Sequence, residues 1–243
     1  MNSTEFYLLA KEKFPFEPTI KQDIVLEQLS EFIFNNSSQV LYVLKGYAGT
    51  GKTTIVGAIV NNLWKAKKSA VLLAPTGRAA KVMSTYSSNE AFTIHKKIYM
   101  PKQNKNGNVD FVMQLNKHKK TIFIVDEASM ISDLPSQSKL FGSGSLLDDL
   151  IQYVYSGHQC KLLLIGDTAQ LPPVKLDLSP ALNEKQLTLN YNKEVSKMEL
   201  DEVMRQGHDS GILMNAPLLR ESLSGAFYDN FKFNILGYND IIR

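Results

Sequence analysis

The sequence GYAGTGKT at residues 46–53 decides the fold, because it matches the pattern G-x-x-x-x-G-K-[ST] in full. An apolar run at 40–44 that is typical of a buried strand precedes it, and a helical pattern at 53–64 follows it. In this setting, glycines keep side chains away, so main-chain N–H groups at the positive end of a helix dipole can surround phosphate oxygens. The stretch therefore predicts a phosphate-binding loop, and a plain glycine-rich turn is a poor alternative for the complete motif.

Two side chains of this loop add specific chemistry. Lys52 brings a positive charge for the β- and γ-phosphates, and the Thr53 hydroxyl is a suitable ligand for Mg²⁺. ATP and Mg²⁺ are therefore the predicted cofactors. The residues of the loop that we expect to contact the nucleotide are Gly46, Ala48, Gly49, Thr50, Gly51, Lys52, Thr53 and Thr54.

Composition limits the class of protein and the partners that the sequence allows. The 243 residues are 44% hydrophobic, which fits one large domain, with or without a small insertion, and excludes a disordered chain. The net charge of +3 permits a nucleic-acid partner without arguing for one. Cys160 is the only cysteine, so there is no disulfide framework or cysteine metal site, as expected in a reducing cytoplasm. No apolar run approaches the roughly 20 residues of a membrane span, so we expect no membrane partner.

Apolar runs alternate with helical patterns along the chain. The runs at 71–73, 122–125 and 162–165 are apolar on both faces, which is typical of a parallel sheet covered on both sides. The fold class is therefore α/β, a doubly wound and mostly parallel sheet whose ligands lie beyond the carboxyl ends of the strands. Strands are predicted at 40–44, 70–74, 121–125, 161–165 and 195–200, and helices at 19–34, 53–64, 77–85, 146–155 and 210–224.

Residues 96–120 interrupt this alternation. Asn106-Gly107 is a strong two-residue turn signal between 98–100 and 109–115, which can pair as strands, so we expect an inserted β-hairpin. A solvated surface hairpin and a nucleic-acid contact are equally good interpretations of its charge. Seven lysines oppose Asp110 alone: Lys96, Lys97, Lys102, Lys105, Lys117, Lys119 and Lys120. A second irregular stretch, 136–145, contains Gly142 and Gly144 and is expected to be a mobile loop.

Carboxylates follow the strand predicted at 121–125. Asp126 is placed to hold the Mg²⁺ shared with Thr53, and Glu127 to polarise an attacking water. A purely structural acidic pair is the alternative, and the phosphate-binding loop in the same chain argues against it. Gln170 follows the strand at 161–165 and is placed to touch the γ-phosphate, although an ordinary Gly-Asp turn at Gly166-Asp167 is also possible.

Six stretches in this order resemble superfamily 1 DNA helicases of the RecD/Dda-like branch. They are GYAGTGKTT from Gly46, APTGRAAKVM from Ala74, FTIHKKI from Phe92, VDEASM from Val125, GDTAQLPPV from Gly166 and EVMRQ from Glu202. The resemblance runs from about Gln22 to Gly225. It implies the first RecA-like, P-loop NTPase domain of an ATP-hydrolysing motor that moves 5′ to 3′ on single-stranded DNA.

The resemblance also implies roles for residues outside the phosphate-binding loop. Gln22 corresponds to the glutamine that reads the adenine edge, and an exposed helix glutamine is the alternative. Arg205 corresponds to the arginine that meets the γ-phosphate, where a five-donor cation suits the spreading charge, and a surface arginine is the alternative. His118, His158 and His208 have no metal-ligand spacing and are interpreted as surface residues.

DNA-facing positions follow from the same resemblance. They are Pro75, Thr76, Thr93 and His95, of which the threonines would donate hydroxyls to phosphates. Lone threonines after a strand are also often helix caps. The hairpin occupies the position of a strand-splitting pin, where Tyr99 or Phe111 could stack on a base, although hairpin aromatics are more often cross-strand packers.

Helicases of this kind place ATP between two RecA-like domains, and we expect this chain to supply only the first. The expected layout is residues 1–95 and 121–225 for the ATP-binding domain, 96–120 for the basic hairpin, and 226–243 for a segment that leads to a missing second domain in cis. Because translocation needs two domains that close around ATP, we expect weak or absent activity from the fragment.

Two other functions compete with this interpretation. One is a P-loop ATPase of another kind, such as an AAA-type remodeller or a transport ATPase, and the GDTAQLPPV and APTGRAAK stretches disfavour it. The other is a catalytically silent DNA-binding module, and the complete set of Lys52, Thr53, Asp126 and Glu127 disfavours it.

Overall fold

The computed structural model describes residues 1–103, 107–133 and 140–202, together with a few positions further on: Gly211, Asn215, Leu218, Leu219, Ser222 and 232–235. The chain divides into two units, Met1–Glu202 and Val203–Arg243. In the second unit the Asn215 amide donates to the carbonyls of Gly211 and Asn234, each at 2.7 Å. The helix predicted at 210–224 lies largely outside the described residues.

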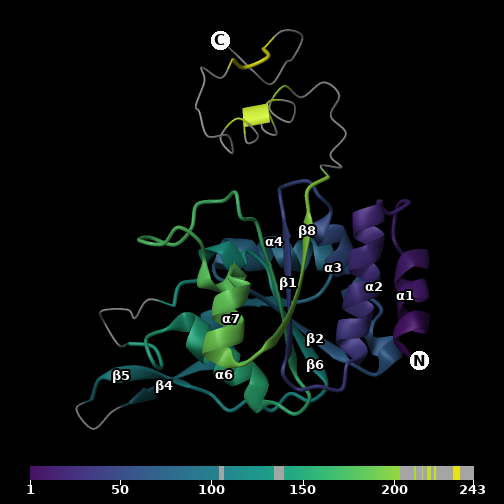
Figure 1. Cartoon of the computed structure of the whole chain (residues 1–243). Helices are drawn as coiled ribbons and strands as arrows, with labels where there is room; N and C mark the ends of the chain where they lie inside the picture. The colour runs from purple at the N-terminus through teal and green to yellow at the C-terminus, as the bar shows by residue number, and fades with distance from the viewer. Residues whose placement is uncertain are drawn as a thin grey trace. The chain divides into compact units, whose positions relative to one another are not determined.

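A six-stranded parallel sheet forms the centre of the first unit (Figure 1). The spatial order of the strands is β3-β2-β6-β7-β1-β8. Their bounds are β1 Val40–Gly46, β2 Ser69–Ala74, β3 Ala91–Thr93, β6 Thr121–Val125, β7 Lys161–Gly166 and β8 Glu194–Leu200. The predicted α/β class and all five predicted strands are confirmed, whereas the short edge strand β3 was not predicted.

Helices cover both faces of the sheet, as Figure 1 shows. Alternate strand residues face opposite cores: Tyr42 and Leu44 belong to one apolar cluster, and Leu41 and Val43 to the other. The first face carries α1 Ser3–Glu12, α2 Ile20–Phe34, α3 Lys52–Val60 and α4 Gly77–Ser87, and the second carries α5 Ile94–Ile98, α6 Leu146–Ser156 and α7 Glu184–Tyr191. This two-sided burial is the reason why the strands are apolar on both faces.

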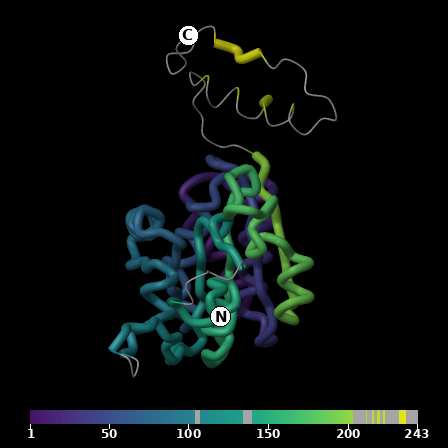
Figure 2. The backbone as a smooth tube through the Cα atoms, turned by 90° about the vertical axis from the view of Figure 1, so that its left-hand side faces the viewer, coloured from purple at the N-terminus to yellow at the C-terminus, as the bar shows by residue number. Residues whose placement is uncertain are grey.

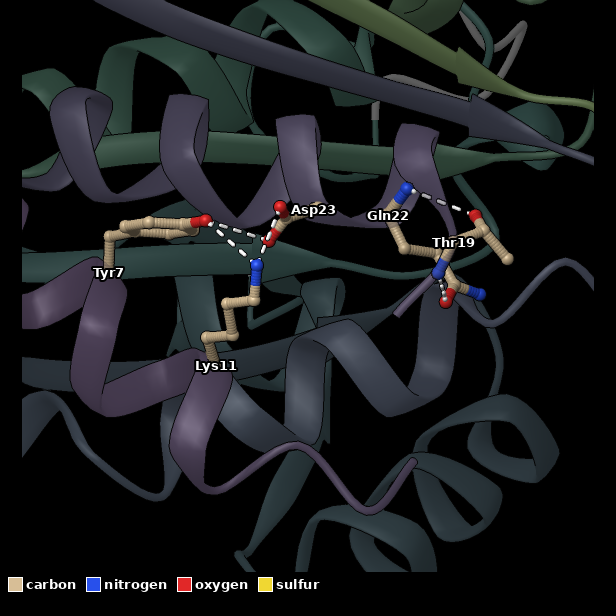
Figure 3. Close-up of polar contacts among 5 residues, drawn as sticks. All are labelled: Tyr7, Lys11, Thr19, Gln22 and Asp23. Atoms are coloured by element: carbon tan, nitrogen blue, oxygen red, sulfur yellow. Dashed lines mark hydrogen bonds and ion pairs between the residues drawn. The ribbon is translucent and has the colours of Figure 1, made fainter. Parts of the chain in front are cut away.

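Three of these helices, α1, α5 and α7, were not predicted. In α1 the side chains of Asn2 and Glu5 form a capping box that satisfies the first N–H groups. Asp23 of α2 then accepts hydrogen bonds from Tyr7 and Lys11 of α1, each at 2.8 Å (Figure 3). The mixed polar composition of residues 1–13 gave no clear helical pattern. The amphipathic character of α1 is recognised only from its packing against α2.

The helix predicted at 53–64 is shorter than expected. It ends at Val60, and a 3-10 helix, η1 Leu63–Ala66, follows it before β2. Two further 3-10 helices, η2 Ala128–Met130 and η3 Pro180–Leu182, lie after β6 and before α7.

The predicted β-hairpin is confirmed. Strands β4 Tyr99–Gln103 and β5 Val109–Met113 pair antiparallel, and both views show the hairpin projecting from the sheet (Figures 1 and 2). The Phe111 ring stacks on Phe141 with 4.6 Å between ring centroids, and the Phe111 N–H and carbonyl bond Leu140 and Gly142. These contacts join residues 140–142 to the hairpin, the mobility expected of 136–145 stays a prediction, and 136–139 lie outside the described residues.

A buried lysine joins the sheet to the end of α2. The Lys161 ammonium, at the first position of β7, donates to the carbonyls of Phe32, Asn35 and, at 3.1 Å, Ile33. These carbonyls lie at the negative end of the helix, where a cation is favourable. Across the described ranges, the structure has no helix whose length and apolar character suit a membrane span.

Candidate functional site

Three adjacent strands bring the predicted site residues to one edge of the sheet. Strands β6, β7 and β1 are neighbours, and all three run in the same direction. Glu127 follows β6, Asp167 follows β7, and the phosphate-binding loop follows β1. Lys52, Asp126 and Asp167 each influence the pKa of Glu127, which places these four charges near one another. The predicted convergence at the carboxyl edge is therefore present in the fold.

The phosphate-binding loop is closed by its own lysine. The Lys52 ammonium donates to the carbonyls of Gly46 and Tyr47 at 2.6 and 2.8 Å. Helix α3 begins at Lys52, and no side chain caps its first turn. The N–H groups of that turn, which lack partners within the helix, are therefore the donors that suit a phosphate.

Gln22 packs directly against this loop. Its amide nitrogen donates to the Thr50 carbonyl at 3.1 Å, and its amide oxygen accepts from the Thr19 N–H in a capping box (Figure 3). The residue is only 5% exposed, so it is not an exposed helix glutamine. Its role in reading adenine stays a prediction.

Gly51 is a loop position whose backbone favours glycine. Its φ of +89° is left-handed, and a Cβ atom there would lie 2.4 Å from the Gln22 amide nitrogen. The backbone conformation favours glycine, and an added Cβ would displace the end of the Gln22 side chain from its bond with the Thr50 carbonyl.

Asp126 has a partner that the sequence did not suggest. The Tyr86 hydroxyl, from the end of α4, donates to Asp126 Oδ2 at 2.8 Å, and the Glu127 N–H donates to Oδ1 at 2.9 Å. Burial and the neighbouring Asp126 raise the pKa of Tyr86. Tyr86 therefore keeps its proton and remains a donor that fixes the orientation of the carboxylate.

Glu127 combines an unusual backbone with an unusual pKa. Its φ of 56° and ψ of 37° lie in the left-handed region, which is uncommon for a residue with a side chain and is often found at functional sites. Burial, followed by the charge of Asp126, raises the pKa of Glu127, while a hydrogen bond from Gln170 and the charge of Lys52 oppose that rise. A carboxylate with a raised pKa is a better general base.

Ser129 determines which way the Gln170 amide points. The buried Ser129 hydroxyl donates to Gln170 Oε1 at 3.2 Å. The amide nitrogen of Gln170 is consequently the end that can donate to Glu127. A serine of the VDEASM stretch thus connects the polar tips of β6 and β7.

The residues present fit a magnesium ion bound together with a nucleotide. In the parts of the chain that the structure describes, no group of three or more His, Cys, Asp or Glu side chains could hold a metal by itself. Mg²⁺ commonly takes one or two protein oxygens and completes its shell with phosphates and water. Asp126 and the exposed Thr53 can supply such oxygens.

The predicted DNA-facing threonines serve as helix caps. Thr76 accepts from the Ala79 N–H and begins α4, and Thr93 accepts from the Lys96 N–H and begins α5. Pro75 is half-buried beside Thr76. A capping oxygen still leaves its hydroxyl proton available to a phosphate, so their contact with DNA stays a prediction.

His95 lies within an aromatic cluster at the base of the hairpin. Its ring meets Phe141 edge-on at 5.0 Å and lies 5.7 Å from Tyr99. Tyr99 is buried and donates to Asp149 at 2.6 Å. Burial lowers the pKa of His95. Tyr99 and Phe111 thus pack in the protein, which favours the packing interpretation over base stacking for both. Arg205 lies outside the described residues.

The comparisons with known proteins agree with this geometry. A family model described as "AAA domain" matches residues 27–228. The chain is 32% identical over 158 residues to the ATP-dependent RecD2 DNA helicase of Deinococcus radiodurans, covering 65% of this chain and 19% of that protein. It is 31% identical over 182 residues to the ATP-dependent DNA helicase dda of Enterobacteria phage T4, covering 72% of this chain and 35% of that protein.

A third curated relative is an uncharacterised protein of Methanocaldococcus jannaschii, 32% identical over 162 residues. The chain spans between 13% and 35% of the length of these three relatives. Among solved structures, a Pif1 helicase from Candida albicans matches with a TM-score of 0.50 and 24% identity, covering 79% of this chain and 41% of that one. This likeness bears on the fold alone.

Proposed function

The chain belongs to the AAA-domain family whose model matches residues 27–228, and we propose that it acts as the ATP-binding and ATP-hydrolysing part of a DNA helicase motor. The relatives from Deinococcus radiodurans and phage T4 confirm the predicted resemblance to the RecD/Dda-like branch. Those relatives are named as helicases, and this supports a motor over the AAA-type remodeller.

One observation supports this proposal above the others. The phosphate-binding loop follows β1, Asp126 and Glu127 follow β6, and Gln170 follows β7, and these three neighbouring parallel strands end at one edge of the sheet. Phosphoryl transfer to water requires a phosphate cradle, a metal-holding carboxylate and a group that orients the water. The edge provides a residue for each of these requirements.

Each residue has a distinct part in the proposed reaction. The N–H groups of the α3 first turn receive the phosphates, and Lys52 leaves the Gly46 and Tyr47 carbonyls to neutralise them. Asp126 and Thr53 would hold Mg²⁺, which neutralises charge on the β- and γ-phosphates. Glu127 accepts a proton from the attacking water. Gln170 lies beside Glu127 and donates a hydrogen bond to its carboxylate.

The proposed nucleic-acid partner is single-stranded DNA, with movement from 5′ to 3′. Thr76 and Thr93 would donate their remaining hydroxyl protons to phosphates, and Pro75 and His95 lie beside them in the sequence. Unwinding additionally requires a second RecA-like domain in cis, which would close over the nucleotide and bring a further cation to the site. Arg205 is proposed to meet the γ-phosphate.

The test is nucleotide binding by the 243-residue chain. A fluorescent ATP analogue with Mg²⁺ should bind to the wild type, whereas Lys52→Ala should lose most of the affinity because the phosphate charge is no longer neutralised. Glu127→Gln keeps the shape of the base and should bind as the wild type does. Equal binding by Lys52→Ala and the wild type would contradict the proposed site.

A further inference from the structure

The edge of the sheet where the strands begin lies opposite the nucleotide edge and is positively charged. The three loops that lead into the neighbouring strands β2, β6 and β7 are residues 61–68, 114–120 and 157–160, and they contain no Asp or Glu. Six lysines lie in these loops. Lys65 interacts with Glu12, and the other five form what we call the basic edge: Lys67, Lys68, Lys117, Lys119 and Lys120.

Strand pairing, not sequence proximity, assembles this surface. The register places Ser69 of β2 opposite Thr121 of β6, so Lys68 and Lys120 precede paired residues. The Ser69 N–H donates to the Lys120 carbonyl at 3.3 Å, and the Lys120 N–H donates to His158 in the next loop at 2.8 Å. Lysines about 50 residues apart in the chain are therefore neighbours in the fold, and Lys117 to Lys120 belong to this edge instead of the hairpin.

The charges of Lys68 and Lys120 repel each other. Burial and the charge of Lys120 both lower the pKa of Lys68. Within the described ranges, none of the five lysines forms an ion pair with a carboxylate. The nearby Glu12, which interacts with Lys65, forms its own ion pair with Lys13 at 2.9 Å. Four of the five lysines are exposed, and Lys68 is half-buried.

An exposed aromatic ring lies in the same loop as two of these lysines. Trp64, the single tryptophan of the chain, is 70% exposed. Lys65 lies over its ring at 5.7 Å. A large apolar ring beside unpaired cations suits a partner that has both phosphates and flat bases, because bases stack on aromatic rings. An acidic protein would satisfy the charges but would not use the flat face of the ring.

We propose that the basic edge is a second nucleic-acid contact, which binds the phosphate backbone of DNA without reading its sequence, away from the nucleotide edge. The proposal rests on the motor function proposed above. The last strand of the hairpin, β5, ends at Met113, and the chain runs from it directly into residues 114–120, which carry Lys117, Lys119 and Lys120 of the basic edge. The contact would hold DNA ahead of the strand-splitting position.

Trp64 provides the readout for the test. Titration of the 243-residue chain with a short random-sequence DNA duplex, and with its single strand, should quench Trp64 fluorescence. Binding should weaken steeply with salt. Lys119→Glu should weaken binding several-fold and lower the slope of log affinity against log salt by about one. The matched control is Lys185→Glu, an equally exposed lysine on α7, which should behave as the wild type does.

Two results would overturn the proposal. One is equal affinity and equal salt slope for Lys119→Glu and Lys185→Glu. The other is quenching of Trp64 by anionic lipid vesicles but not by DNA. Nucleotide binding, measured on the same samples, separates failure of the second site from failure of the proposed motor function. A chain that binds the ATP analogue with Mg²⁺ but shows no DNA contact at Trp64 lacks only the second site.

Discussion

The Tyr86 hydroxyl donates a 2.8 Å hydrogen bond to Asp126 Oδ2 across 40 residues of sequence. Tyr86 lies near the end of α4, the helix that begins at the predicted DNA-facing Thr76. One helix therefore has its first residues at a proposed DNA contact and its last turn against the proposed metal ligand.

Tyr86→Phe should weaken the use of Mg²⁺ while leaving the fold intact. Loss of a hydrogen bond to a carboxylate costs roughly 1.5–3 kcal/mol, part of which is recovered because Asp126 keeps the bond from the Glu127 N–H. The Mg²⁺ concentration for half-maximal binding of the ATP analogue should rise about five-fold or more by this estimate. The matched control is Tyr191→Phe, which removes a similar bond to Asp148 on the other face. Equal Mg²⁺ dependence in the two variants would contradict a positioning role for Tyr86.

Gln170→Ala should raise the pKa of Glu127 further. Burial and Asp126 already raise the pKa of this carboxyl group, and the Gln170 hydrogen bond is one of the interactions that oppose them. Without that bond the charged form loses a donor, so the group should keep its proton to a higher pH than in the wild type. The side-chain carboxyl resonance of Glu127, followed by NMR as pH rises, reports this directly.

Ser129→Ala is a second test of the same connection. It removes the donor that orients the Gln170 amide, so it should shift the Glu127 titration in the same direction by a smaller amount. An unchanged titration in both variants would show that Gln170 does not act on Glu127.

Gly51→Ala should damage the phosphate-binding loop for two separable reasons. The added Cβ would lie 2.4 Å from the Gln22 amide nitrogen, and the φ of +89° is unfavourable for any residue with a side chain. In a Gln22→Ala background the clash disappears, and only the backbone cost of roughly 1–2 kcal/mol remains. The free energy of unfolding should therefore fall less for Gly51→Ala in that background than in the wild type. Strictly additive losses in a double-mutant cycle would contradict a direct Gln22–Gly51 contact.

The parts of the fold that the sequence predicted are those with local signals. The runs at 71–73, 122–125 and 162–165 are apolar on both faces because helices cover the sheet twice, and the strand before GYAGTGKT ends where its glycines begin. Parallel strands share a carboxyl edge, so residues that follow different strands were correctly expected to meet there.

The remaining features depend on contacts between distant segments. Nothing near Tyr86 in the sequence indicates that its hydroxyl reaches Asp126, and nothing near Gln22 indicates that α2 is buried against the loop at Thr50. The register of β2 and β6 likewise moves Lys119 and Lys120 from the predicted hairpin to the edge where the strands begin. Such relationships arise from packing, which a local pattern does not contain.

Lys161→Met should remove a specific pH dependence of stability. Burial, together with the charge of Lys68, lowers the pKa of Lys161 to about 8 from an ordinary value of 10.5. Between these two values the unfolded chain binds more protons than the folded one, so this lysine makes stability rise with pH across that window. Each pKa unit corresponds to about 1.4 kcal/mol, so the wild type should gain on the order of 3 kcal/mol over Lys161→Met.

The measurement is denaturant unfolding of the wild type and Lys161→Met between pH 8 and pH 10.5. Subtraction of the two curves cancels the groups that titrate alike in both proteins, such as the tyrosines. Below pH 8 the difference should be constant, because Lys161 is then charged in both states and donates to the α2 carbonyls. Lys185→Met, at an exposed position on α7, should stay parallel to the wild type throughout. The difference in the free energy of unfolding between wild type and Lys161→Met could instead stay constant with pH. That result would show that Lys161 has its ordinary pKa in the folded protein, because its carbonyl partners offset the whole cost of burial.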